Sequence, residues 1–194
     1  MHVAEGVLAW PVLSGGAAIT FCAVYIGLRR LESNRIPQTA IMASAFFVAS
    51  LIHVPLGPGS MHLILNGLMG IVLGWACLPA ILVALLLQSI LFQFGGLTAL
   101  GVNTVIMAVP ALTCGLLFRF FAPETKGFIA VLSFFLGAGA VLFSALLAAL
   151  ALALSGQEFI NAAKLLFIAH LPVSAIEGII TCVSTSFIYK VKPE

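Results

Sequence analysis

Residues 62–93, HLILNGLMGIVLGWACLPAILVALLLQSILFQ, form an apolar run that contains no Asp, Glu, Lys or Arg. A membrane-spanning helix needs about 20 apolar residues, at a rise of about 1.5 Å per residue. The run is too long for one span and only just long enough for two short ones. Pro79 supplies a break inside it. We therefore expect two membrane helices here, over 62–76 and 80–94.

The composition of the whole chain agrees with this interpretation. The chain has 194 residues, of which 62% are hydrophobic and 7% charged, whereas a soluble domain carries about 25% charged residues. So few charges cannot cover a solvated surface, and an integral membrane protein is predicted. The net charge of +2 is too small to indicate a nucleic-acid partner. We expect a single membrane domain over residues 1–194, in which residues 1–10 precede the first span.

Charged residues, prolines and glycines mark the ends of the other spans. The fold class expected is all-α, a polytopic membrane bundle of seven transmembrane helices. The predicted helices cover 11–28, 39–52, 62–76, 80–94, 102–120, 128–154 and 165–189. Gly70 and Gly74 and the small-residue run GAGA (137–140) are typical either of close helix packing or of ordinary membrane helices. The four cysteines have no C-x-x-C spacing and are expected to be free thiols.

Lysines and arginines predict how the bundle faces the membrane. Seven spans place the termini on opposite sides, and cytoplasmic loops are enriched in basic residues. With the N-terminus outside and the C-terminus cytoplasmic, only Lys164 lies outside. The basic residues then on the cytoplasmic side are Arg29, Arg30, Arg35, Arg119, Lys126, Lys190 and Lys192. We expect a multi-pass protein of the cytoplasmic (inner) membrane in this orientation.

This topology places all four histidines, His2, His53, His62 and His170, in the outer half of the membrane. A single histidine is more often a packing residue than a ligand. Four on one side of so apolar a chain favour a site, although the sequence does not show that they share a face. Hydrolase and nucleotide-binding motifs such as H-E-x-x-H, G-x-S-x-G and Walker A do not occur. A transport or binding function is therefore favoured over catalysis.

His2 is the most informative of the four. The opening MHVAEG lacks the basic region of a signal peptide, and the bulky His2 disfavours removal of Met1. The amine of Met1, the amide nitrogen of His2 and its Nδ1 can then chelate one metal in five- and six-membered rings. His62 could supply a fourth nitrogen. Four nitrogens in a plane suit Ni(II) or Cu(II), and low-spin Co(II) as well.

Three further polar residues lie inside predicted spans. Glu177 is the only acid within a span, and an intramembrane carboxylate indicates a functional site or a hydrogen-bonded staple. It lies near the same helical face as His170, and Pro172 between them is expected to free a backbone carbonyl. Asn103 and Gln88 either orient metal ligands or join helices by hydrogen bonds, the second being favoured.

Four segments together resemble the CbiM/NikM family, the substrate-binding (S) components of energy-coupling-factor (ECF) importers for cobalt and nickel. They are MHVAEG (1–6), VPLGPGSMHL (54–63), LLLQSILFQFGGLTALGVNTVIMA (85–108) and AHLPVSAIEGIIT (169–181). The resemblance covers most of the chain and implies a seven-helix fold. It also implies a Ni²⁺ or Co²⁺ substrate site made by the Met1 amine, the His2 amide and imidazole, and the His62 imidazole, with no organic cofactor.

The resemblance further implies partners: a transmembrane coupling (T) subunit, two cytoplasmic ATPase subunits and often a small accessory membrane protein. The chain itself would be a transporter subunit and not an enzyme. It departs from the family pattern at Gln93-Phe94, before the paired glycines, and at His53, where Asn is common. His53 is thus a possible extra or ligand-orienting residue, as are Asn103, Gln88, His170 and Glu177. The alternatives are an S component for an organic vitamin and an intramembrane metal-dependent hydrolase.

Overall fold

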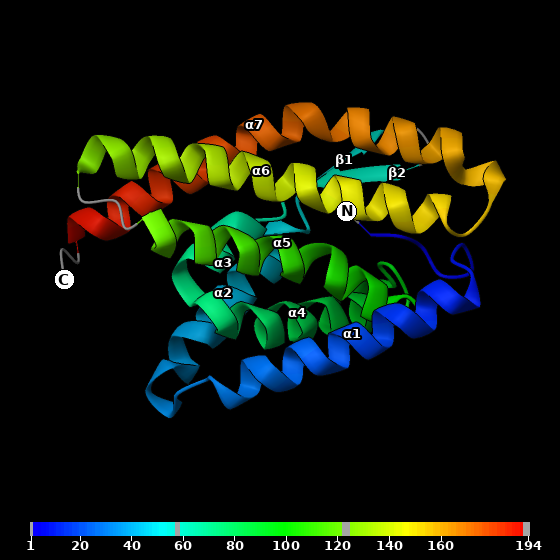
Figure 1. Ribbon diagram of the computed structural model, residues 1–194, viewed down its shortest axis with the longest axis horizontal. Helices are drawn as coiled ribbons and strands as arrows, with labels where there is room; N and C mark the ends of the chain where they lie inside the picture. Colours follow the sequence, from blue (N-terminus) through cyan, green and yellow to red (C-terminus); the bar gives the residue numbers. More distant parts are fainter. Residues whose placement is uncertain (1, 57–58, 122–124, 192–194) are drawn as a thin grey trace.

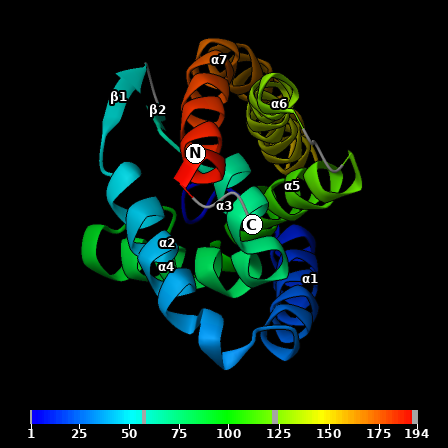
Figure 2. The ribbon, with the colours of Figure 1, turned by 90° about the vertical axis from the view of Figure 1, so that its left-hand side faces the viewer.

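The structure is a computed structural model that describes residues 2–56, 59–121 and 125–191. Long helices run roughly side by side (Figure 1), and two short β-strands lie at the edge of the bundle (Figure 2). The elements in chain order are α1 (Trp10–Arg29), α2 (Ile36–Ala49), β1 (His53–Leu56), β2 (Gly59–His62), α3 (Asn66–Leu73), α4 (Cys77–Phe92), α5 (Leu100–Phe121), α6 (Lys126–Ala153) and α7 (Ile160–Val191). Short 3₁₀ turns cover Ser33–Arg35, Gly74–Ala76 and Gln157–Phe159. The all-helical membrane bundle is confirmed.

Five segments among the described residues are long and apolar enough to cross a membrane, instead of the seven spans expected. They are Trp10–Arg29, Asn66–Phe92, Leu100–Phe121, Lys126–Ala153 and Gln157–Val191. Helix α2 has 14 residues and α3 has 8, which correspond to lengths of about 21 and about 12 Å. Each is shorter than the hydrocarbon core of a bilayer, which is about 30 Å thick.

The break inside the run 62–93 exists, but it lies at Gly74 and not at Pro79. Gly74 has a φ of +57° and begins the 3₁₀ turn that separates α3 from α4. This left-handed conformation favours glycine. Pro79 instead lies in the first turn of α4, where a backbone N–H would have no partner within the helix. Pro79 is therefore compatible with α4 and does not cause the break that was expected at this residue.

The segment between α2 and α3 also differs from the prediction. Helix α2 ends at Ala49 and α3 begins only at Asn66, so His53 and His62 do not lie in helices. They lie in β1 and β2, which pair antiparallel with His53 opposite His62. Prolines and glycines prevent a helix in this segment, and the hairpin satisfies its backbone by pairing it with itself.

The centre of the bundle is α3, which the other helices surround when the bundle is viewed along its axis (Figure 2). Gly70 on α3 lies so close to the carbonyl of Ala111 on α5 that a Cβ would overlap it. A Cβ on Gly137 of α6 would likewise overlap the side chain of Thr181 on α7. The small residues at 70 and 137 therefore serve close packing between helices of the same chain.

Two long helices, α5 and α7, continue through an internal proline. Helix α7 begins at Ile160, earlier than the predicted residue 165, and passes through Pro172 without ending. Helix α5 likewise contains Pro110. The continuity of α7 through Pro172 agrees with the single helix predicted over 165–189, and packing against α6 supports the helical path where proline removes a backbone N–H.

Basic residues concentrate at one end of the bundle. Arg29, Arg119 and Lys190 lie in the last turns of α1, α5 and α7. These turns lie at the same end of the molecule, opposite the end where α1 and α7 begin (Figure 1). Lys164 lies near the start of α7 and hence at the other end. The charge asymmetry predicted along the chain is thus also an asymmetry in space.

Candidate metal site

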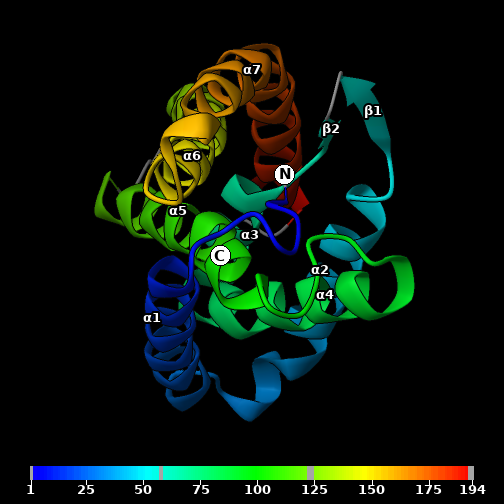
Figure 3. The same ribbon diagram turned by 90° about the vertical axis from the view of Figure 1, so that its right-hand side faces the viewer.

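His2 and His62 are 60 positions apart in the sequence and adjacent in the structure. Their rings stack with 4.8 Å between centroids, and the ring of Phe94 lies 6.0 Å from that of His2 on another side. The N-terminal segment reaches this position by entering the end of the bundle between β2 and the turn that follows α4 (Figure 3). The structure therefore brings together two of the residues predicted as metal ligands.

Asn103 on α5 fixes the backbone next to His2. The Val3 N–H donates to Asn103 Oδ1 at 2.9 Å, and Asn103 Nδ2 donates to the Val3 carbonyl at 3.1 Å. Both residues are buried, so the bonds are shielded from water. Asn103 thus joins the N-terminal segment to α5 through these bonds, whereas the sequence favoured a hydrogen bond between helices for this residue.

The turn after α4 is shaped to receive this segment. Gly95 and Gly96 have φ values of +75° and +79°, which glycine adopts without a steric penalty. A Cβ on Gly95 would lie 2.6 Å from Asn103 Nδ2 and 3.4 Å from the Cβ of His2. A Cβ on Gly96 would lie 2.6 Å from the carboxylate of Glu5. The glycines allow the segment to lie directly on the turn.

Glu5, for which the sequence suggested no single role, contacts this turn. Its Oε1 accepts a hydrogen bond from the Thr98 N–H at 3.3 Å. The bond is exposed and long for a hydrogen bond, so its contribution to stability is small. Two sides of the segment are therefore held, by Asn103 at Val3 and by Thr98 at Glu5.

His62 ends β2 in a buried position. Its Nδ1 lies 2.9 Å from the Leu63 carbonyl, which can only accept, so Nδ1 carries the proton and Nε2 the lone pair. Burial lowers the pKa of His62 from 6.5 to about 4, a shift that the Leu63 carbonyl opposes and the charge of His170 reinforces. The imidazole is neutral at pH 7, the form that binds metals.

His2 has a similar environment. Burial lowers the pKa of its imidazole from 6.5 to about 4. Neither Nδ1 nor Nε2 has a hydrogen-bond partner among the described residues, and both atoms are buried. A buried nitrogen without a partner is uncommon and requires an explanation. A neutral imidazole whose lone pair binds a metal would provide that explanation.

The other two histidines lie close by. His170 on α7 is buried, and its Nδ1 donates to the Leu166 carbonyl one turn back at 2.7 Å. Its Nε2 has no partner in the described part of the chain. His53 is opposite His62 in the hairpin backbone, while its side chain lies outside the described residues. The hairpin thus places the backbones of His53 and His62 opposite each other, and the charge of His170 acts on the His62 imidazole.

Glu177 and Gln88 join elements by hydrogen bonds. The Glu177 carboxylate accepts from the backbone N–H groups of Ile64 and Leu65, which lead into α3. Gln88 Nε2 on α4 donates to Ser50 Oγ after α2 at 2.6 Å. Among the described residues, the structure shows no hydrogen bond from Gln88 to His2 or to His62. Of the two roles considered for Gln88, the structure shows the interhelical bond.

Side chains alone do not complete a metal site. Within residues 2–56, 59–121 and 125–191, no three His, Cys, Asp or Glu side chains cluster as metal ligands. The predicted chelate does not require such a cluster, because two of its nitrogens are the Met1 amine and the His2 amide. Met1 itself lies outside the described residues.

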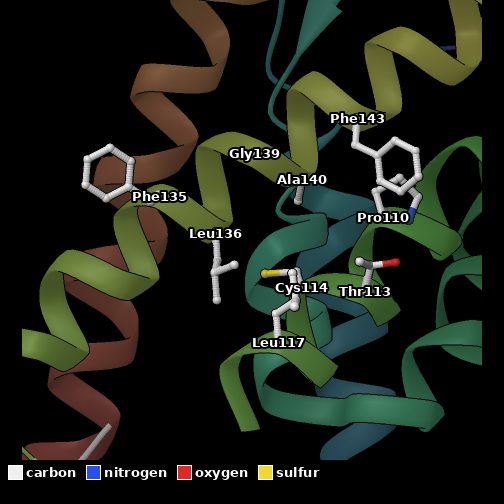
Figure 4. Close-up of a pocket in the computed structure, with 9 residues that line it drawn as sticks. All are labelled: Pro110, Thr113, Cys114, Leu117, Phe135, Leu136, Gly139, Ala140 and Phe143. Carbon is white, nitrogen blue, oxygen red and sulfur yellow. The ribbon is translucent and has the colours of Figure 1, made fainter. Parts of the chain in front are cut away.

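A second region, a cleft with a largely apolar lining, lacks the chemistry of a metal site. It has a volume of about 190 Å³ and lies between α5 and α6, where Phe135, Phe143 and Leu117 line it (Figure 4). Its polar groups bond to backbone, Thr113 to the Val109 carbonyl and the Cys114 thiol to the Gly67 carbonyl. All four cysteines are free, as expected.

Comparison with known proteins points to metal transport. The family described as CbiM, cobalt uptake substrate-specific transmembrane region, matches residues 2–194. A Haemophilus influenzae protein named for metal transport is 45% identical and aligns over 100% of this chain and 96% of its own length. The cobalt transport protein CbiM of Sorangium cellulosum is 29% identical over 100% of this chain and 93% of the relative.

Two further comparisons concern a fusion protein and a solved structure. The fused nickel transport protein NikMN of Rhodobacter capsulatus is 38% identical over 56% of this chain and 33% of the relative. The crystal structure of a transition metal transporter superposes with a TM-score of 0.86 at 24% identity, over 100% of this chain and 95% of the other, which shows a shared fold. From the match over residues 2–194, the chain belongs to the CbiM family of cobalt uptake substrate-specific transmembrane proteins.

Proposed function

We propose that this protein is the substrate-specific component of an ECF-type importer that captures Ni²⁺ or Co²⁺ outside the cell. The ligands are the Met1 amine, the His2 amide nitrogen, His2 Nδ1 and the imidazole of His62. The observation that carries the proposal is the stacking of the His2 and His62 rings at 4.8 Å, with the His62 side chain buried. Four nitrogens suit these late transition metals better than Mg²⁺ or Ca²⁺, which prefer oxygen.

The protonation states of the two imidazoles also support the proposal. Both imidazoles are neutral at pH 7, since burial lowers the pKa of each to about 4. No proton has to leave them before the metal binds, although the amine and the amide still lose protons. Residues 2–8 act as the lid: Val3 and Leu8 are buried in the hydrophobic core, so the metal would be enclosed when the segment is in place.

The orientation follows from the charges. The N-terminal segment faces the outside, and the end of the bundle with Arg29, Arg119 and Lys190 faces the cytoplasm, in line with the positive-inside rule. The chain then forms one membrane domain of the cytoplasmic membrane. Helices α2 and α3 complete a seven-helix arrangement, the former as a short span and the latter as a half-span.

Energy comes from partners in this proposal. A transmembrane T subunit and two cytoplasmic ATPases would drive release of the metal to the inside, with or without a small accessory membrane protein. Fused proteins named NikMN and CbiMQ among the relatives support association with other membrane components. Nickel or cobalt is the cargo of the cycle, and the chain carries out no catalysis.

The decisive experiment changes only the terminal amine. The purified protein with its native N-terminus is titrated with Ni²⁺ and Co²⁺ by calorimetry, beside a variant with one residue added before Met1. The addition converts the chelating amine into an amide, so the affinity should fall at least 100-fold. A matched control carries the same extra residue after Glu194 and should bind like the native protein. Equal affinity of all three proteins would refute the N-terminal site.

A second comparison tests the imidazole of His62. His62→Ala removes one of the four nitrogens and should weaken binding strongly. Cys22→Ser, at an exposed free thiol remote from the site, is the matched control and should change nothing. Retained affinity in His62→Ala would exclude His62 as a ligand even if the N-terminal amine binds metal.

A further inference from the structure

Glu177 is a buried carboxylate inside a membrane helix, and all its hydrogen bonds go to one short stretch of backbone. The side chain is 1% exposed. One oxygen accepts from the Ile64 N–H, and both oxygens accept from the Leu65 N–H at 3.0 Å. An acid in this location is costly unless it has a specific role. The proposed metal ligands do not include it.

The stretch that Glu177 holds, Ile64 and Leu65, lies immediately before Asn66, the first residue of α3. The first N–H groups of a helix have no partners within the helix, and a negative charge is favourable there. Leu65, which precedes Asn66 at the start of α3, provides no side-chain cap and has a φ of +52°. This left-handed conformation is unfavourable for leucine. The Glu177 carboxylate accepts hydrogen bonds from the N–H groups of Ile64 and Leu65 and so holds this backbone in place.

His62 is two residues before Ile64, so the same stretch determines where its imidazole lies. On one side the β2 strand fixes His62 by pairing it with His53. On the other side Glu177 fixes Ile64 and Leu65. The His62 ring is tied to the intervening residue by the contact between its Nδ1 and the Leu63 carbonyl. The contact between Nδ1 and the Leu63 carbonyl therefore depends on backbone that is held at both ends.

We propose that Glu177 is a positioning residue that anchors the His62 imidazole to α7 in the geometry for binding metal. The inference rests on the proposed function, since His62 is there a ligand. The proposal connects α7 to the metal site through Glu177, a side chain that is not itself a ligand. Residues that orient metal ligands in this way typically change metal affinity about 10- to 100-fold when replaced.

The test compares Glu177→Gln with the native protein. Glutamine keeps the shape but replaces one acceptor oxygen with an NH₂ group, which would face the backbone N–H groups. We expect Ni²⁺ affinity to fall about 10- to 100-fold and the visible d–d absorption of the bound metal to shift. Thr185→Val is the matched control, because Thr185 is also buried on α7, two turns further along. It should retain the native affinity and spectrum.

A double-mutant cycle separates positioning from general stability. If Glu177 acts through His62, the combination of Glu177→Gln with His62→Ala binds metal no more weakly than His62→Ala alone. Additive losses would overturn the proposal, as would native affinity and spectrum in Glu177→Gln. Should Glu177→Gln not fold, Glu177→Asp, which keeps both oxygens on a shorter side chain, takes its place in the same cycle. Absence of Ni²⁺ and Co²⁺ binding by the native protein would instead refute the proposed function.

Discussion

Val3 and Asn103 exchange two hydrogen bonds, in which the side-chain amide of Asn103 both accepts from and donates to the backbone of Val3. The amide thus pairs with Val3 much as a neighbouring β-strand would. Because Val3 follows His2 directly, this pairing fixes the residue proposed to chelate the metal. The consequences of this and three other features are open to measurement.

Asn103→Ala should weaken metal binding by about 10- to 100-fold. The substitution removes both bonds to Val3 and leaves a buried N–H and a buried carbonyl without partners, at a cost of about 1–3 kcal/mol each. Calorimetric titration with Ni²⁺ measures the effect. Thr113→Val on the same helix is the control, because its hydroxyl bonds only to the Val109 carbonyl. Native affinity in Asn103→Ala would mean that the segment is held by other contacts.

Gly95→Ala should also impair binding, for a steric reason. The new Cβ would lie 2.6 Å from Asn103 Nδ2, at a φ of +75° that alanine rarely adopts. The N-terminal segment would have to move away from the turn, and the measured dissociation constant for Ni²⁺ should rise. Gly139→Ala is the control, since a Cβ there meets nothing within 4 Å. The prediction fails if the two variants bind equally well.

Glu5→Gln should have a much smaller effect than Asn103→Ala. The bond from the Thr98 N–H to Glu5 is exposed and 3.3 Å long, and such bonds contribute about 0.5–1.5 kcal/mol. We expect less than a tenfold increase in the rate at which bound metal is lost to a chelator, followed by absorbance. Glu158→Gln, at another exposed acid, should leave this rate unchanged. A loss as large as that of Asn103→Ala would show that Glu5 is itself a ligand.

The metal-free protein should lose stability as the pH falls from about 6.5 towards 4. Burial lowers the pKa values of His2 and His62 to about 4, whereas the unfolded chain binds protons at the ordinary value near 6.5. In this window the unfolded state holds more protons, so the free energy of unfolding rises with pH. Thermal melting in detergent between pH 5 and 7.5 measures the slope.

The slope belongs to the two imidazoles and can be removed with them. The double variant His2→Gln, His62→Gln has no such groups in the site, and its melting temperature should vary less over the same pH range. His170 remains in both proteins, so any dependence that it contributes is common to the comparison. An identical slope in the native protein and the variant would show that other groups titrate.

Local signals located most helix ends but misplaced those near proline. The end of α1 at Arg29 follows from the charge pair Arg29-Arg30, which is unfavourable inside a membrane. Pro79 suggested a break because proline lacks an N–H, yet in a first helical turn this N–H is not needed. At Gly74, whose positive φ separates α3 from α4, an added Cβ would lie 2.5 Å from the guanidinium of Arg119, a residue distant in the sequence. A sequence window around Gly74 does not contain Arg119.

The candidate site could be predicted in part. His2 and His62 were identified because chelation by an N-terminal amine requires histidine at residue 2 and because the charges place both residues on one side. The contacts of Val3 with Asn103 and of Glu177 with Ile64 and Leu65 join residues about 100 positions apart. In each of these contacts one partner is a backbone group, which every residue possesses. The residue types in the sequence therefore did not indicate which backbone groups the side chains of Asn103 and Glu177 would bind.

The sequence by itself determined that the chain lies in a membrane, and it predicted the side on which the histidines gather, because hydropathy and charge act on each segment independently of its neighbours. Only the tertiary structure decided that residues 53–56 pair with residues 59–62, that α3 is a short central helix, and that His2 stacks on His62. These features depend on packing between segments distant in the chain, where backbone hydrogen bonds and the space left by glycine determine which conformation is stable.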